Sequence, residues 1–261
     1  MKLQKFYKLT QPDGFDFYTG GTINYRDAVG KTVRAPNFNA SGELCSSAFL
    51  HASRKPDQCF VGASIPCSAF VVRGAPILED NQKVGFESLY IEKEVDPASI
   101  FKWNYNAAAN PINPFSIRPP KIAQRHILLL KNWATVWATV GATVWDTIWD
   151  TVGATVWATV GATVGVTVGA TVWATIGATV GNTVWDTVWD TVGDTVGATV
   201  WDAVGAYAGS LLVPVVKQWK IRYPFRDAVD LWYDGLVPSF DGKTWRLHGN
   251  QNANILYEEK I

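Results

Sequence analysis

The central stretch of the chain, residues 133–208, repeats a four-residue pattern without interruption, and this repeat constrains the fold more than any other feature. It consists of nineteen tetrads such as Trp-Ala-Thr-Val and Gly-Ala-Thr-Val. The first position is only Trp or Gly, the third is Thr in seventeen tetrads, and the fourth is Val or Ile in eighteen. Such regularity is typical of architectures in which each unit buries its apolar atoms against the next.

A long α-helix conflicts with this period, because four residues turn a helix by about 400° and each column of side chains drifts by about 40° per tetrad. The ten glycines of the repeat would each cost a helix about 1 kcal/mol relative to Ala. In an extended chain, Trp/Gly and Thr share one face and Ala/Asp and Val the other, and β-branched and aromatic residues favour that conformation. We therefore predict a β-solenoid with three or four tetrads per coil.

The predicted fold class is mainly β, in three parts. Residues 1–132 form a small α+β N-terminal domain that ends in a linker and a segment capping the first coil, residues 133–208 form the tetrapeptide-repeat solenoid, and residues 209–261 form a small α+β C-terminal cap. Turn residues and apolar periodicity place the local elements. We expect strands at 5–10, 15–19, 68–74, 87–95 and 253–259, a hairpin turning at Asp241-Gly242, and helices near 55–60 and at 226–235.

Charge is distributed unevenly along a chain of zero net charge. Residues 1–132 carry sixteen basic and eleven acidic side chains, whereas the repeat carries six Asp and no basic residue. This balance favours a protein partner over nucleic acid, and the Trp and Val content of the repeat predicts a homo-oligomer. The first residues lack an apolar signal sequence, so we expect a cytoplasmic location rather than secretion.

The repeat also contains thirty-five consecutive uncharged residues, between Asp150 and Asp186. That length could span a bilayer. Frequent Thr and Gly, and the lack of flanking Lys or Arg, argue against insertion, so a membrane-inserted repeat is kept as a less favoured alternative.

Two groups of residues are candidate binding sites. Cys45, His51, Cys59 and Cys67 could supply four zinc ligands, although their spacing fits no common zinc module and the favoured interpretation is a structural one without metal. In the C-terminal part, Trp245, Arg246 and His248 could form a small binding patch. Packing within a hairpin is the favoured interpretation of these three. No cofactor is predicted.

Residues 43–94 contain Cys45, His51-Ala52, Pro56, Asp80, Lys83 and Glu94 at places that resemble the pattern of a phage- and prophage-associated domain of unknown function. The sequence departs from that pattern at Ala48-Phe49-Leu50, where a Gly is usual. Members of that family often continue into low-complexity repeats. The resemblance implies a phage-linked origin, with a location in the host cytoplasm or in a virion, and no established activity.

The same domain offers an enzymatic alternative. His51, Tyr90 and Glu94 resemble the His-Tyr-Glu set of ADP-ribosyltransferase-like folds, in which the Glu would stabilise an oxocarbenium-like centre while the His positions NAD. No nucleotide-binding loop accompanies them. The leading hypothesis is therefore a non-enzymatic structural or binding protein, phage-associated, that presents a rigid repeat surface.

Overall fold

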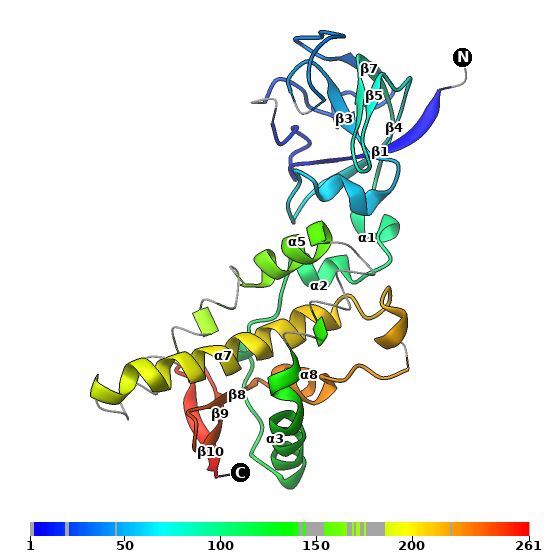
Figure 1. The fold of residues 1–261 in the computed structure, drawn as a ribbon. Helices are drawn as coiled ribbons and strands as arrows, with labels where there is room; N and C mark the ends of the chain where they lie inside the picture. Colours follow the sequence, from blue (N-terminus) through cyan, green and yellow to red (C-terminus); the bar gives the residue numbers. More distant parts are fainter. Residues whose placement is uncertain are drawn as a thin grey trace. The chain divides into compact units, whose positions relative to one another are not determined.

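The structure is a computed structural model, and the chain in it divides into two compact units (Figure 1). Unit 1 comprises Met1–Tyr105 with Ala154–Thr159, and unit 2 comprises Asn106–Gly153 with Val160–Ile261. The residues that the structure describes are 3–18, 21–44, 46–140, 143–144, 154–165, 169, 171–172, 175, 186–219 and 221–260.

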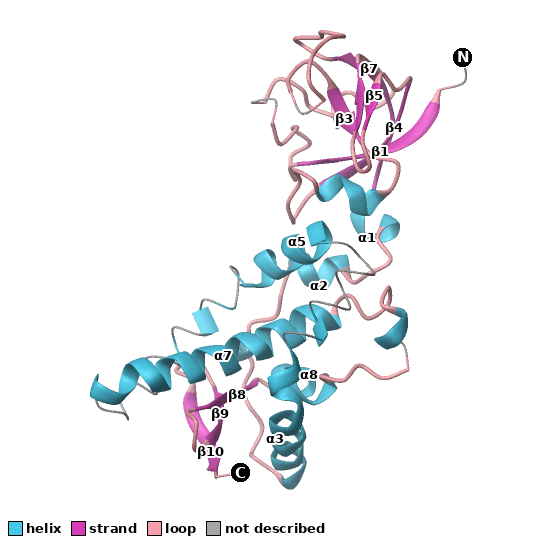
Figure 2. Cartoon of the chain, in the orientation of Figure 1, coloured by secondary structure: helices cyan, strands magenta, loops and turns pink. Residues whose placement is uncertain are grey.

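Unit 1 is built from two small antiparallel sheets (Figure 2). One sheet has the order β1-β4-β7-β2 and the other has the order β3-β6-β5. Their bounds are β1 Gln4–Thr10, β2 Thr32–Arg34, β3 Leu50–Ala52, β4 Ser68–Gly74, β5 Leu78–Glu79, β6 Val84–Phe86 and β7 Ser88–Val95. The helical elements are η1 Pro56–Phe60 and α1 Pro97–Ile100, followed by α2 Tyr105–Ala109 at the boundary with unit 2.

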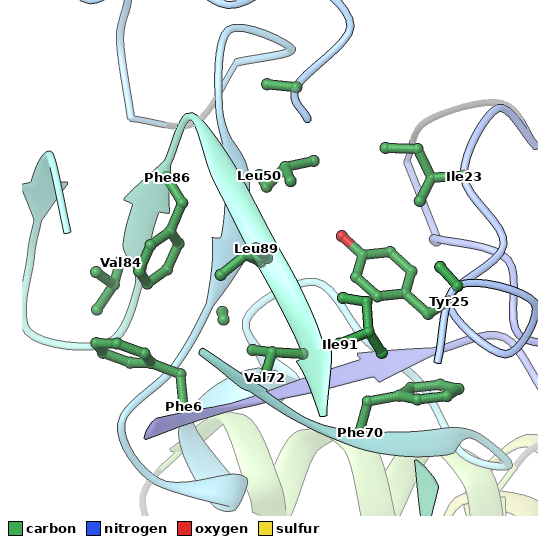
Figure 3. Close-up of a cluster of buried hydrophobic side chains, with 13 residues drawn as sticks. Phe6, Ile23, Tyr25, Leu50, Phe70, Val72, Val84, Phe86, Leu89 and Ile91 are labelled. Atoms are coloured by element: carbon green, nitrogen blue, oxygen red, sulfur yellow. The ribbon is translucent and has the colours of Figure 1, made fainter. Parts of the chain in front are cut away.

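Side chains from both sheets form the core of unit 1 (Figure 3). The ring of Phe6 on β1 meets that of Phe86 on β6 edge to face, with the centroids 4.8 Å apart. Tyr25 joins from the loop after β1, and its hydroxyl points into the cluster. Each such side chain contributes about 2 kcal/mol on burial. The remaining members are Ile23, Ala28, Ala35, Leu50, Ala52, Phe70, Val72, Val84, Leu89 and Ile91.

Unit 2 packs helices against a three-stranded antiparallel sheet of order β10-β9-β8. Its elements are η2 Pro114–Ser116, α3 Gln124–Val136, η3 Trp137–Thr139, α7 Asp186–Ser210, η5 Lys217–Trp219, α8 Arg226–Tyr233, β8 Leu236–Phe240, β9 Trp245–Gly249 and β10 Asn254–Glu259. A further helix, α5 Ala154–Val164, begins in unit 1 and ends in unit 2.

Aromatic side chains hold the helices of unit 2 together. Tyr207 of α7 stacks on Trp232 of α8, with the ring centroids 5.1 Å apart, and Trp133 of α3 meets Phe225 at 6.4 Å. The same stacked pair is hydrogen-bonded to the backbone of Ile112, in the linker before η2. The Ile112 N–H donates to the Tyr207 hydroxyl at 3.1 Å, and the Trp232 indole donates to the Ile112 carbonyl at 2.9 Å.

The predicted β-solenoid over 133–208, and with it the mainly β fold class, is wrong. Wherever the structure describes this repeat, the chain is helical, in α3, η3, α5 and α7, and the protein as a whole is mixed α and β. The tetrads at 145–152 and 177–184 lie outside the described residues. With the solenoid, the expected capping roles of the segment before 133 and of residues 209–261 also fail, since both pack within unit 2.

The fourth column of the repeat explains why the chain forms helices here rather than strands. Every residue of this column from Val140 onward whose burial the structure describes is buried, which includes Val160, Val164, Val196, Val200 and Val204. Side chains four apart lie on one helix face, and over three tetrads the drift of about 40° each stays close to the width of an ordinary apolar stripe. The drift therefore excludes one endless helix but allows separate helices in which the column faces the core over about three tetrads, as it does in α7 from Val196 to Val204.

Threonine, which disfavours helices by hydrogen-bonding alternative backbone conformations, is accommodated here by bonding back to its own helix. The Thr135 hydroxyl donates to the Lys131 carbonyl at 3.0 Å, and the Thr175 hydroxyl donates to the Thr171 carbonyl at 2.7 Å. This i to i−4 bond satisfies the hydroxyl without leaving the helix. The intrinsic preference of the repeat for strand is therefore weak enough for tertiary packing to override.

Predictions for the local elements outside the repeat fared better. The strands at 5–10, 68–74 and 87–95, the short helix with Pro56 in its first turn, the helix from Arg226 and the last strand are confirmed. The hairpin turns at Gly242 as predicted, with φ at +87°. The strand expected at 15–19 is wrong over its described residues, where only an isolated bridge from Phe15 to Asn24 forms. Among the described helices, none is both long and apolar enough to cross a bilayer.

Candidate functional site

A cleft beside β3 in unit 1 combines open volume with buried charge. Its larger hollow has a volume of about 520 Å³, and a smaller hollow of about 50 Å³ shares Tyr18, His51 and Lys83 with it. We call the two together the His51 cleft. Its lining consists of Tyr7, Lys8, Leu9, Asp16, Phe17, Tyr18, Thr22, Pro36, Asn37, Ser46, Ser47, Phe49, Leu50, His51, Ala52, Ser53, Cys59, Val61, Gly62, Ala63 and Lys83.

A buried ion pair lies at the wall of the His51 cleft. The ammonium of Lys8, on β1, is 2.5 Å from the Asp16 carboxylate, and only 11% and 7% of the two side chains are exposed. The other Asp16 oxygen accepts from the Tyr18 backbone N–H at 3.0 Å. Burial by itself would raise the pKa of Asp16, but the Lys8 charge and these hydrogen bonds outweigh it and lower the pKa. Asp16 is therefore ionised and fixed in position.

His51 occupies the middle residue of β3, between two core residues, so its ring faces away from the core. Its Nε2 bonds to the Leu44 carbonyl, which can only accept, so Nε2 carries the proton and Nδ1 keeps a lone pair. Burial lowers the pKa of His51; the Leu44 bond opposes this, while Lys8 and Lys83 lower the pKa further. The imidazole is therefore neutral at pH 7 and available as a hydrogen-bonding group.

Tyr18 stands at the edge of the cleft with 77% of its surface exposed. Its ring is backed by Gly62, where a Cβ would come within 2.9 Å of the Tyr18 Cε2 atom. Gly62 has φ at +114°, a conformation that L side chains rarely adopt, so both the backbone and the close approach require glycine. The Tyr18 ring is thus supported at its edge by backbone while most of it stays open to solvent.

The three residues of the enzymatic alternative are not brought together in the cleft. His51 lines it, but Tyr90 and Glu94 are absent from its described lining. Both lie on β7, where Tyr90 alternates with core residues and faces away from them. Glu94 is paired with the Arg26 guanidinium at 2.8 Å, which lowers the Glu94 pKa.

Two of the candidate zinc ligands, Cys59 and Cys67, are free thiols in unit 1. Burial raises the pKa of Cys59 to about 12 and that of Cys67 to about 11, so both thiols are protonated at neutral pH. The Cys67 carbonyl and N–H both bond to the Tyr105 hydroxyl, at 3.0 and 2.8 Å. Within the described residues no group of three or more His, Cys, Asp or Glu side chains could hold a metal ion. Cys45, the remaining candidate ligand, lies outside them.

The C-terminal candidates are packed into the hairpin of β8 and β9. Trp245 is buried and stacks on Phe240, with the ring centroids 4.8 Å apart. Arg246 pairs with Asp241 at 2.6 Å across the turn. His248 is fully buried and hydrogen-bonded at both ring nitrogens. Arg246 and His248 therefore use their polar atoms internally.

Sequence reasoning missed Lys8, Asp16 and Tyr18. One signal was present, because Lys8 follows Phe6 at the two-residue spacing of an inward strand face, where a charge requires a buried partner. The partner, in a loop eight residues later, could not be identified from the sequence. The contact between Tyr18 and Gly62 could not be predicted either, because the two residues lie in separate segments that share no sequence pattern.

Fold and site together define a two-unit protein of mixed α and β structure with a polar cleft in unit 1. No protein-family model matches the chain, and no curated protein or solved structure matches it either. The resemblance of residues 43–94 to a phage-associated domain therefore stays a prediction, as do the homo-oligomer and the ADP-ribosyltransferase-like activity. Function has to be argued from the His51 cleft.

Proposed function

We propose that unit 1 is a binding module that holds a small polar molecule in the His51 cleft, without changing it chemically. The volume of about 520 Å³ is within the range of small-molecule sites. The cleft also combines apolar wall residues such as Phe49 and Leu50 with a few fixed polar groups. That combination gives a ligand both contact area and orientation.

One observation carries this proposal: the Lys8–Asp16 pair is buried beside open volume. Removing two charges from water costs several kcal/mol, and a well-packed apolar pair would stabilise a small domain as well or better. The two-sheet core of unit 1 is complete without the pair, since Phe6, Phe86 and their neighbours already fill it. A charged pair retained at a cavity wall, with a neutral histidine beside it, is typical of a binding site.

The test is a ligand screen on the full chain, read by ¹H–¹⁵N NMR. Amino acids, dicarboxylates, sugar phosphates and nucleoside monophosphates are added at millimolar concentration. We expect at least one class to shift the amide signals of Tyr18, His51 and Lys83, and His51→Ala to weaken that binding.

The matched control is Tyr90→Ala, because Tyr90 is a partly exposed residue of unit 1 outside the cleft. We expect it to bind as the unchanged chain does. If every class leaves the cleft signals unshifted, or if Tyr90→Ala and His51→Ala weaken binding equally, the proposal is wrong.

A further inference from the structure

The tautomer of His51 sets a first requirement on any ligand of the cleft. His51 lines both hollows, and its Nε2 proton is donated to the Leu44 carbonyl. The ring therefore offers a ligand only the lone pair of Nδ1, which accepts a hydrogen bond and cannot donate one. The oxygens of an ionised carboxylate or phosphate also only accept, so they can make no bond there. The part of a ligand that meets His51 must carry a hydrogen-bond donor.

The charges around the cleft set a second requirement, because they balance. Lys8 is paired with Asp16. Lys83, the other lysine of the described lining, has Asp80 beside it, and the Asp80 carboxylate accepts from the Lys83 backbone N–H at 2.6 Å. That bond is the largest of several effects, the Lys83 charge among them, that lower the pKa of Asp80 and keep it ionised. A charged ligand would leave water without an excess of opposite charge to receive it, so the balance favours an uncharged ligand.

The polar groups on the wall suit hydroxyls. The Asn37 amide donates to the Ser47 hydroxyl at 3.5 Å, and both side chains line the larger hollow. An amide and a hydroxyl each have positions to donate and to accept. The ammonium of Lys8 and the carboxylate of Asp16 likewise have more hydrogen-bonding positions than their mutual contact uses. A ligand hydroxyl, which both donates and accepts, can bond to any of these groups and to Nδ1 of His51.

Tyr18 adds a third requirement, an apolar face on the ligand. It is the most exposed aromatic residue that the structure describes in unit 1, and it contributes to both hollows. The bond from its backbone N–H to Asp16 fixes the start of the side chain, and the close approach of Gly62 limits where the ring can move. A restrained, exposed ring binds the apolar face of a ligand with little loss of conformational freedom.

We propose that the ligand of the His51 cleft is an uncharged sugar, with the C–H face of its ring packed on Tyr18 and one of its hydroxyls donating to Nδ1 of His51. This inference rests on the proposed binding function and names the chemical class of its ligand. A sugar ring combines the three required properties, since it has an apolar C–H face, a rim of hydroxyls that donate and accept, and no charge.

The test adds neutral sugars to the classes of the ligand screen, each with charged counterparts on the same ring. Glucose, galactose and mannose are titrated into the full chain beside the uronate of each, which is an anion, and the amino sugar of each, which is a cation. Affinity is measured by NMR at the amides of Tyr18, His51 and Lys83. We expect at least one neutral sugar to bind, and its uronate and amino sugar each to bind roughly tenfold or more weakly.

Deoxy sugars and His51→Ala together test the contact with Nδ1. Removing the hydroxyl that donates to His51 should weaken binding to the unchanged chain roughly tenfold, because Nδ1 then lacks a donor. In His51→Ala the same deoxy sugar should bind as well as its parent sugar, since the contact no longer exists. Tyr18→Leu should weaken the best sugar roughly tenfold, whereas the matched change Tyr90→Leu leaves it unchanged. Circular dichroism and melting temperature establish that each variant is folded.

Several outcomes would overturn the inference while leaving the binding module intact. A uronate or amino sugar that binds as tightly as its neutral parent would refute selection for an uncharged ligand. A full set of deoxy sugars without a loss, or a loss that persists in His51→Ala, would refute the bond to Nδ1, and unchanged affinity in Tyr18→Leu would refute the packing on its ring. Cleft signals that shift only with compounds other than sugars would refute the ligand class. Failure of every compound in the extended screen to shift these signals would instead refute the binding function itself.

Discussion

The buried histidine of unit 2 gives the most direct test of the described packing. The Ala253 carbonyl can only accept, so at 2.9 Å from Nδ1 of His248 it requires the proton on Nδ1. Nε2 then accepts from the Ser239 hydroxyl at 2.8 Å. The neutral ring is fully satisfied in a dry site. A second proton would place an unsolvated charge there, and burial accordingly lowers the pKa of His248 to about 4.

The magnitude follows from proton linkage. A fall in pKa from 6.5 in the unfolded chain to about 4 in the folded one changes the free energy of unfolding by about 3 kcal/mol once the pH is below both values. Because the unfolded state binds the proton more readily, the stabilisation is complete above the unfolded pKa and is lost as the pH falls toward the folded one. Between about pH 7.5 and about pH 5, the contribution of His248 should decrease by about 2 kcal/mol.

Asp202 on α7 opposes this loss of stability at low pH, so its carboxylate is replaced to make the effect of His248 measurable. Burial raises its pKa to about 6, so its folded-state contribution becomes more favourable as the pH falls through that value. Asp202→Asn abolishes this contribution. We therefore expect the variant to lose more stability on acidification than the unchanged chain does. His126 has a pKa lowered mainly by burial, so it acts in the same direction as His248.

Two measurements check the reasoning. Urea unfolding of the Asp202→Asn variant, followed by tryptophan fluorescence at several pH values, gives the free energy of unfolding. NMR titration of the three histidine ring Hε1 signals assigns the effect to residues. The His248 signal should remain that of neutral imidazole down to about pH 5. A midpoint near the ordinary value of 6.5 in the folded protein would refute the burial, the hydrogen bonds and the predicted acid sensitivity together.

Two further predictions concern the repeat. Gly169→Ala should destabilise unit 2 by about 1–3 kcal/mol, because a Cβ there would lie 2.6 Å from the Trp201 ring. Gly205→Ala should instead stabilise α7 by up to about 1 kcal/mol, because no atom lies within 4 Å of the added carbon. Equal effects of the two variants in thermal unfolding would argue against this packing. Thr199→Val should lower the free energy of unfolding by about 1–3 kcal/mol, since the buried Thr199 hydroxyl accepts from the Phe240 N–H at 3.1 Å. An unchanged unfolding midpoint would refute that hydrogen bond.

Local signals in the sequence were sufficient for most elements outside the repeat. The turn at Gly242 needs a positive φ, and Gly235, at φ +74°, ends α8 in the same way. The alternation of Leu89 and Ile91 with exposed neighbours defined β7. In each case the physical cause lies within a few residues of the element, so a window of sequence contains it.

For the repeat, the same local signals predicted the wrong structure, because a four-residue period is compatible with two structures. A strict four-residue pattern gives one consistent face in a strand and also in a helix short enough that the drift stays within one stripe. Which one forms depends on what the face packs against. In α7, Val196, Val200 and Val204 are buried in unit 2, whose partner segments lie far along the chain. No window within the repeat contains that information.

Like unit 1, unit 2 contains a nearly buried ion pair, Arg246 with Asp241, so the open volume beside the charges, rather than their burial, is the reason to place function in unit 1. In unit 2, His248 and Thr199 each bond to neighbours inside a packed core, where they specify the arrangement of hairpin and helix. In unit 1, Lys8 and Asp16 carry full charges at the wall of an open cavity, where an apolar pair would serve packing better. Polar groups that are fully used internally explain a fold, whereas charges maintained beside open volume remain to be explained by a ligand.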